Sequence, residues 1–200
     1  MKLVSLLVFK WVENSSVLLS ITADLSEFNF FTRNSIREHI IFHSRLIVGR
    51  TPVGSRQAVS MEEKLGRCYA YVHPSGLAAA VLTDNEYPMR VAFNLLSAAL
   101  RDFFESYGMK GLESSADQEL EWPRGMELLQ EYKDPDSADK LSKVQRDLDE
   151  VKEVMLKNID DLLLRGEQME SLMQKTNDLS SASYTFYRQA KKNNQCCTAI

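Results

Sequence analysis

The sequence predicts an α+β domain with a five-stranded, antiparallel-rich sheet sandwiched by helices, followed by one long coiled-coil helix and a short tail. The order of strand-like and helix-like segments before residue 133 predicts the domain. A heptad pattern after residue 140 predicts the long helix, and two adjacent cysteines mark the tail. A chain of 200 residues is long enough for one compact domain and such an appendage.

The first half of the domain reads as a hairpin and a helix. Leu3–Phe9 and Val17–Ile21 are rich in strand-forming residues, and Glu13–Ser16 between them is typical of a turn. Apolar residues at helical spacing then predict a helix from Phe28 to Ile47, with Asn34 or Ser35 as its cap.

Three more strands and two helices complete the domain. The strands are predicted at Gln57–Ser60, Cys68–Val72 and Leu77–Thr83. Pro88 then opens a long helix at the first helical position, which suits proline. The face of that helix that we expect to pack on the sheet carries Val91, Leu95, Ala98, Ala99 and Phe103. A short helix is predicted at Met126–Tyr132, and a polar segment containing Pro135 ends the domain.

Beyond this boundary, apolar residues recur in alternating steps of three and four. A stripe of this kind is buried against other helices in coiled coils. A lone helix with such a stripe is marginal in water, so it needs partner helices or the neighbouring domain. The predicted seam positions are Leu141, Val144, Leu148, Val151, Met155, Asn158, Leu162, Arg165, Met169, Leu172, Thr176, Leu179, Ser183, Phe186 and Ala190.

Arg165 interrupts the apolar seam. A guanidinium is costly to bury unless hydrogen-bond acceptors surround it, so partner helices must supply acceptors at this layer. A single polar layer also fixes the register of a helical bundle. The alternative is a surface arginine that lies beside the stripe.

Composition excludes several classes of function. A net charge of −4 and a pI near 5.5 give no broadly basic surface, so nucleic-acid binding is not expected. Three cysteines do not make a disulfide framework, which favours the cytosol. The apolar N-terminus lacks the cleavage site of a signal peptide. No run reaches the ~18–20 apolar residues of a membrane span, so membrane attachment must come from lipid or from a partner.

The tail ends in Cys-Cys-Thr-Ala-Ile. With Cys197 as its first residue, this is a C-a-a-X box and predicts a prenyl group on Cys197. Ile200 is an unusual final residue, which leaves the choice between farnesyl and geranylgeranyl open. The alternative is a frayed tail with two unmodified thiols.

Two stretches of the C-terminal half, Leu148–Met155 and Asn158–Glu167, resemble the R-SNARE motif, with Arg165 in its central zero layer. The preceding half resembles a longin domain, which has a profilin-like fold. The stretches most similar to Ykt-type longin SNAREs are Phe28–Phe31, Asp84–Pro88 and Arg90–Phe93.

This resemblance implies a domain organisation and a set of lipids. It divides the chain into a longin domain (1–133), a linker (134–140), an R-SNARE motif (141–193) and a lipidation tail (194–200). It implies a prenyl group on Cys197, added by a prenyltransferase, and a palmitoyl or second prenyl group on Cys196. No other cofactor, no metal and no enzymatic activity are expected.

The resemblance also implies a function. The chain would join three Q-SNARE helices in a parallel four-helix bundle and so fuse vesicle membranes. It would act from the cytosol and the cytoplasmic face of Golgi, ER-derived vesicle and endosomal or vacuolar membranes. Before fusion, the seam and the lipid would fold back onto the chain's own longin domain, which inhibits assembly and shields the lipid. The alternative is a longin adaptor or tether that docks on a partner without driving fusion.

Phe42 is the candidate for the groove that receives the seam. Together with Ile40 and Ile41, it places apolar residues on more faces of the helix than one sheet can cover. The alternative is that all three residues belong to the core of the domain.

Two further patterns have simpler interpretations than a site. Gly49–Arg56 has the spacing of a P-loop, but Ser55 and Arg56 stand where lysine and serine or threonine belong, so we interpret it as a loop. His39 and His43 are four residues apart on a helix, but no third metal ligand is evident, so we expect structural or surface histidines.

Two other candidates for chemistry are also interpreted as structural. Cys68 lies in a predicted strand without a nearby histidine and is expected to be a packed thiol. Asp84 and Glu86 flank a helix start and are expected to be capping or first-turn charges rather than a catalytic pair.

Overall fold

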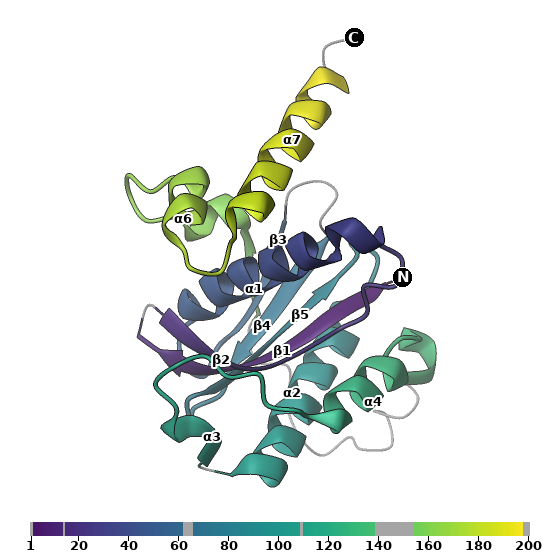
Figure 1. Cartoon of the computed structure of the whole chain (residues 1–200). Helices are drawn as coiled ribbons and strands as arrows, with labels where there is room; N and C mark the ends of the chain where they lie inside the picture. Colours follow the sequence, from purple (N-terminus) through teal and green to yellow (C-terminus); the bar gives the residue numbers. More distant parts are fainter. Residues whose placement is uncertain (1, 14, 62–65, 109, 139–153, 198–200) are drawn as a thin grey trace. The chain divides into compact units, whose positions relative to one another are not determined.

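The computed structural model describes residues 2–13, 15–61, 66–108, 110–138 and 154–197, and the chain forms two compact units (Figure 1). Unit 1 combines Met1–Asp24 with Ser44–Leu162. Unit 2 combines Leu25–His43 with Leu163–Ile200. The division therefore falls inside the first long helix, and unit 2 joins two segments that are far apart in the sequence.

Unit 1 is built on a six-stranded sheet with the strand order β2-β1-β5-β4-β3-β6. Neighbouring strands are antiparallel except for β6, which runs parallel to β3. The strands are β1 (Leu3–Val12), β2 (Ser15–Ala23), β3 (Arg56–Ser60), β4 (Arg67–Val72), β5 (Leu77–Thr83) and β6 (Val154–Asn158). The five strands predicted from the sequence are confirmed, with bounds that differ by a few residues.

The sixth strand comes from the segment predicted to be coiled coil. Two predicted seam residues lie in it, with Met155 paired to Gln57 and Asn158 paired to Ser60. Strand β3 would otherwise present its N–H and C=O groups at an open edge of the sheet, and β6 satisfies them. In the chain alone, without partner helices, this edge provides the hydrogen bonds that the seam segment needs.

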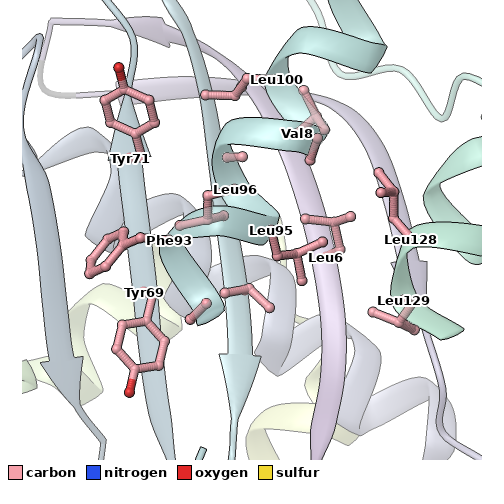
Figure 2. Packing of buried hydrophobic residues seen from close by; sticks show 14 of the residues in the cluster. Leu6, Val8, Tyr69, Tyr71, Phe93, Leu95, Leu96, Leu100, Leu128 and Leu129 are labelled. Carbon is pink, nitrogen blue, oxygen red and sulfur yellow. The ribbon is translucent and has the colours of Figure 1, made fainter. Parts of the chain in front are cut away.

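The core of unit 1 lies between the sheet and two helices, α2 (Met89–Tyr107) and α4 (Pro123–Glu131). Figure 2 shows Tyr69 and Tyr71 of β4 beside Phe93 of α2, and the rings of Tyr69 and Phe93 meet edge to face at 5.5 Å. The predicted apolar face of α2 is confirmed: Val91, Leu95, Ala99 and Phe103 are buried and Ala98 is partly buried. The part of α1 in unit 1 lies on the other face of the sheet (Figure 1).

The remaining helices also have definite bounds. They are η1 (Phe30–Thr32), α1 (Arg33–Gly49), α3 (Lys110–Glu113), η2 (Ile159–Leu162), α6 (Met169–Lys175) and α7 (Ser181–Cys197). Unit 2 contains η1, the first part of α1, α6 and α7.

The predicted caps are wrong at two helices. Asn34 and Ser35 lie inside α1, and the cap is Asn29, whose side chain accepts a hydrogen bond from the Phe31 N–H at 3.0 Å at the start of η1. The 3-10 turn continues directly into α1, so the polar residue before the turn takes the capping position. Pro88 is the N-cap residue of α2 rather than its first helical residue.

The predicted linker contains ordered structure. Asp134 accepts hydrogen bonds from the Asp136 N–H and the Ser137 hydroxyl, and residues 135–138 form a helical turn. Ala138 is buried in the core of unit 1. The predicted boundaries at 1–133, 134–140, 141–193 and 194–200 stay predictions.

Candidate interaction site on the C-terminal segment

The predicted seam is divided among several elements in this structure. Most of its described members lie in β6, η2, α6 and α7, whereas Arg165, Thr176 and Leu179 lie in the irregular backbone at 163–168 and 176–180 that separates these elements. A long helix with one apolar stripe gains its stability from packing, so without partner helices shorter elements that pack on the rest of the chain replace it. Leu141, Val144, Leu148 and Val151 lie outside the described residues.

Arg165 is exposed in the turn between η2 and α6. Gly166 follows it with a φ of +87°, a backbone conformation that glycine adopts at little cost. Of the neighbouring leucines, Leu162 is buried, whereas 54% of the Leu164 surface is exposed. The predicted burial of Arg165 among acceptors concerns an assembled bundle and stays a prediction.

Unit 2 contains a small hydrophobic cluster, which we call the Phe42 cluster. Phe42 of α1, Met173 of α6 and Tyr187 of α7 are buried at its centre. Partly buried around them are Met169, Leu172, Leu179 and Tyr184. The structure thus brings Phe42, the residue singled out from the sequence, together with three of the predicted seam residues, Met169, Leu172 and Leu179.

Met173, Tyr184 and Tyr187 also belong to this cluster, although the heptad spacing did not predict them. Met173 lies four residues after seam residue Met169, and Tyr187 lies four residues after seam residue Ser183, so both are on helix faces next to the stripe. A search for a wider apolar helix face, instead of only the two core positions of each heptad, would have included Met173 and Tyr187.

Polar contacts surround the Phe42 cluster and connect α1 to the start of α7. The Glu38 carboxylate accepts a hydrogen bond from the Ser180 N–H at 2.7 Å, next to the first turn of α7. His39 Nε2 lies 3.0 Å from the Ser183 carbonyl oxygen. Because a carbonyl oxygen only accepts, His39 donates this hydrogen bond from Nε2.

Helix α7 is also bound to α6 by a polar contact. Lys191 forms an ion pair with Glu170 at 3.0 Å, and its ammonium group lies 5.8 Å from the centroid of the Tyr187 ring. Both partners of the ion pair are partly exposed, so its contribution to stability is small.

The pKa values of three groups in unit 2, His39, His43 and Glu38, are lowered. Burial lowers the pKa of His43 to about 4, and its Nδ1–H donates to the His39 carbonyl at 2.8 Å. Burial also lowers the pKa of His39. Burial by itself would raise the pKa of Glu38, but hydrogen bonds from Ser180 and Ser183 lower it overall. All three shifts favour the charge states found at neutral pH, with neutral histidines and an ionised Glu38.

Unit 2 is expected to loosen in acid. A buried His43 with a pKa of about 4, against 6.5 for an accessible histidine, binds fewer protons than in the opened chain. Stability that is present above pH 6.5 is therefore lost as the pH falls towards 4. This shift corresponds to a loss of about 3 kcal/mol, to which His39 and Glu38 add with the same sign. Denaturant unfolding followed in unit 2 at several pH values measures this loss.

The matched variant for this prediction is His43→Leu, which keeps the site buried but cannot take up a proton. It should flatten the dependence of unit 2 stability on pH between these limits. A slope as steep as that of the wild-type chain would contradict the assignment to His43.

The remaining seam residues of α6 and α7 have varied environments. Ser183 is buried, Phe186 is partly buried with its ring centroid 6.4 Å from that of His39, and Ala190 is exposed. Thr176 ends α6, where its hydroxyl accepts from the Asp178 N–H at 3.1 Å. The stripe is therefore only partly covered within unit 2.

The alternative sites from the sequence have structural roles. Gly49–Arg56 follows a helix and precedes a strand, the reverse of a P-loop, and the Arg56 guanidinium lies 4.2 Å from the centroid of the Tyr71 ring. Among the described residues, no group of His, Cys, Asp and Glu side chains is arranged to hold a metal ion. His39 and His43 instead donate to carbonyl oxygens.

Cys68 is a buried thiol, as predicted, and burial raises its pKa to about 12. Asp84 accepts a hydrogen bond from the Glu86 N–H at 3.1 Å and so stabilises the turn before α2, not the helix end itself.

Within the described part of the chain, none of the helices combines the length and apolar character needed to cross a bilayer. Helix α7 ends at Cys197. The predicted lipids on Cys196 and Cys197 stay predictions.

Comparison with known proteins gives two family matches and several relatives of full length. The family model described as Synaptobrevin matches residues 140–199, and the Longin model, described as a regulated-SNARE-like domain, matches residues 25–124. The chain is 43% identical to VAMP-like protein YKT61 of Arabidopsis thaliana, over 100% of both chains. It is 41% identical to VAMP-like protein YKT62 of the same plant, over 100% of both chains. It is 39% identical to the putative synaptobrevin homolog YKT6 of Dictyostelium discoideum, over 98% of each chain.

Proposed function

This chain belongs to the family of Ykt-type longin R-SNAREs, and from that premise we propose that it is a lipid-anchored R-SNARE that drives fusion of vesicle membranes. Its family is a non-enzymatic class that acts in vesicle trafficking. The proposal is supported mainly by one sequence pattern: an apolar stripe at heptad spacing that is interrupted near its centre by a single arginine, Arg165.

The proposed reaction is assembly, not bond chemistry. Three Q-SNARE helices pack on the seam, and a glutamine from each helix accepts hydrogen bonds from Arg165 through its side-chain oxygen. The buried guanidinium then has hydrogen-bond partners, and only one register of the four helices brings these groups together. Burial of the apolar layers on either side supplies the free energy, at about 25 cal/mol per Å² removed from water. As the bundle forms, it draws the two attached membranes together.

Before assembly, we propose that residues of the seam segment contact other parts of the same chain instead of Q-SNARE helices. The pairing of β6 with β3 in unit 1 and the Phe42 cluster in unit 2 support this, because each engages part of the seam segment in contacts that a bundle would replace. The resulting closed form would delay assembly until a partner or a membrane favours the open chain. We further propose that the closed form shields the lipid on the tail.

Membrane attachment is proposed to depend on the two C-terminal cysteines. One lipid chain gives only marginal binding, whereas two give stable attachment, so a prenyl group on Cys197 and a palmitoyl or second prenyl group on Cys196 would act together. A prenyltransferase would be the first partner. The cytosol and the cytoplasmic face of Golgi, ER-derived vesicle and endosomal or vacuolar membranes are the proposed locations.

Substitution of Arg165 by alanine tests the proposed function. It should destabilise a purified complex with three Q-SNARE helices by about 2–3 kcal/mol, because charge-assisted hydrogen bonds of the buried layer are lost and glutamine side chains stay unpaired. The stability of the free chain should not change, because Arg165 is exposed there. Dissociation of the complex in denaturant measures the first effect, and thermal unfolding of the chain alone measures the second.

Arg188→Ala is the matched control, since Arg188 is an exposed arginine of α7 outside the seam. It should leave the complex unchanged. If the chain instead forms a binary complex that is insensitive to Arg165, it acts as a tether, and the proposed function is wrong.

A further inference from the structure

A short segment before α1 exposes an unusual amount of aromatic surface. We call residues 25–33 the aromatic turn. Its three phenylalanines, Phe28, Phe30 and Phe31, are 38%, 75% and 89% exposed. Single exposed apolar residues are common, but a group of large ones on one short segment marks an interaction site.

The aromatic turn is held in one conformation by its own hydrogen bonds. The Asn29 side chain accepts from the Phe31 N–H at 3.0 Å, and the Asn29 carbonyl accepts from both the N–H and the hydroxyl of Thr32 at 2.9 Å. Arg33 Nε donates to the Phe28 carbonyl at 3.1 Å, and its Nη2 donates to the Ser26 carbonyl at 2.9 Å. The exposed rings are therefore presented by a pre-organised backbone whose polar groups are largely paired.

We propose that the aromatic turn binds a lipid bilayer, with Phe30 and Phe31 inserted at the level of the headgroups and upper acyl chains. Insertion requires that the backbone N–H and C=O groups of the turn have hydrogen-bond partners, because unpaired groups make entry into a bilayer unfavourable. The Phe28 N–H is also paired, with the Leu25 carbonyl at 3.1 Å. These groups keep their hydrogen-bond partners when the turn leaves water.

The size of the apolar surface favours a bilayer over a protein partner. Three rings with these exposures present on the order of 400 Å². A stable protein–protein interface buries about 800 Å² on each partner, over some 20–30 residues. Insertion into a bilayer needs no matching surface, so a few rings suffice where another attachment already holds the chain near the membrane.

Arg33 places a positive charge beside the exposed rings, where it can contact lipid headgroups. Its guanidinium lies 5.9 Å from the centroid of the Phe30 ring, so the cation sits beside the part that would insert. Arg33 donates to the Phe28 and Ser26 carbonyls through Nε and Nη2, and the N–H groups on Nη1 can face a lipid phosphate. Long basic side chains commonly keep their charge at the headgroups while their stems follow apolar surface.

This proposal goes beyond membrane fusion by the seam and the lipid tail. It gives the longin half of the chain a direct membrane contact of its own. The contact uses residues outside the seam, so it can be tested without Q-SNARE partners and without natural lipidation.

The test places an indole in the aromatic turn. A full-length chain carrying Cys196→Ser and Phe31→Trp is coupled through Cys197 to phosphatidylcholine vesicles that contain a maleimide-headgroup lipid. Cys68 is buried and will react slowly. We expect the tryptophan emission of this chain to shift to shorter wavelength and to be quenched by lipids brominated in the acyl chain, relative to the same chain without Phe31→Trp.

Two variants make the result specific. Phe104→Trp places the indole at another partly exposed phenylalanine, on α2, and should show neither the shift nor the quenching. Adding Phe30→Ser to the Phe31→Trp chain should abolish most of the quenching. Because insertion is hydrophobic, the quenching should persist at high salt, where electrostatic contacts of Arg33 alone are screened.

Three results would overturn the proposal. The first is an indole at position 31 that stays unshifted and unquenched on vesicles. The second is equal quenching at position 104. The third is a blue shift that depends on protein concentration without vesicles, which would identify a second copy of the chain as the occupant. None of these results bears on the Arg165 experiment, so failure here leaves the proposed function standing.

Discussion

Replacing Phe42 with glutamate is expected to separate α6 and α7 from α1. Phe42 is 5% exposed and forms the centre of its cluster with Met173 and Tyr187. Truncating a buried phenylalanine costs about 3–5 kcal/mol, and a carboxylate buried without a partner adds several more. Opening unit 2 removes this cost, because it returns the new charge to water.

Amide hydrogen exchange measures this opening directly. Protection should fall in α6, in α7 and in the first part of α1, while the sheet of unit 1 keeps its protection. In a lipidated preparation, the released tail should shift the chain towards membranes. The shift follows if the closed form shields the lipid, as proposed above.

Phe104→Glu is the matched control, because Phe104 is 43% exposed on α2 and its replacement adds the same charge without emptying a cluster. It should leave both exchange and partition unchanged. Loss of the near-ultraviolet signal of Trp122, which packs on Phe103 in unit 1, would show that Phe42→Glu unfolds the domain core. That result, or unchanged protection in α7, would contradict the role assigned to Phe42.

Gly66→Ala is expected to destabilise the sheet of unit 1 severely. Gly66 has a φ of +83°, and a Cβ atom there would lie 1.9 Å from the Thr83 carbonyl oxygen and 3.1 Å from the Asp84 Cα. Backbone atoms of β5 and the following turn must move to make room. The left-handed backbone adds about 1–2 kcal/mol, and overpacking adds about 1–3 kcal/mol. Together they predict a loss of about 2–5 kcal/mol in the free energy of unfolding, measured in urea.

Gly76→Ala separates the two contributions. Gly76 has a similar φ of +88°, but no atom lies within 4 Å of the position of its Cβ. It should cost only the conformational part, on the order of 1–2 kcal/mol. Equal destabilisation by the two substitutions would show that the close approach of Gly66 to β5 is not the cause.

Strand and helix positions were largely predictable because they depend on local patterns. The hairpin, β3 to β5 and the buried face of α2 follow from alternation and from helical spacing, which the core then covers. The cap of the first helix was not predictable in this way. Asn29, Asn34 and Ser35 are all acceptable caps, and the 3-10 turn at Phe30–Thr32 decided among them.

The seam segment shows the limit of local patterns more clearly. Its spacing of three and four predicts one helix, yet Val154–Asn158 forms a strand on β3 and irregular backbone follows Leu162. A segment with an apolar stripe has more than one way to bury it, and the partners that are present determine which is used. With only its own chain available, the segment pairs with a sheet edge and packs on Phe42.

By itself, the sequence determined the chemistry of this protein: an apolar stripe with Arg165 at its centre, an α+β domain before it and two cysteines at its end. Only the tertiary structure decided which contacts the stripe makes in the free chain, that Met173 and Tyr187 join Phe42, and that Phe30 and Phe31 remain exposed. The physical reason is that periodicity reports which face of a segment is apolar. What covers that face depends on surfaces brought together from distant parts of the chain.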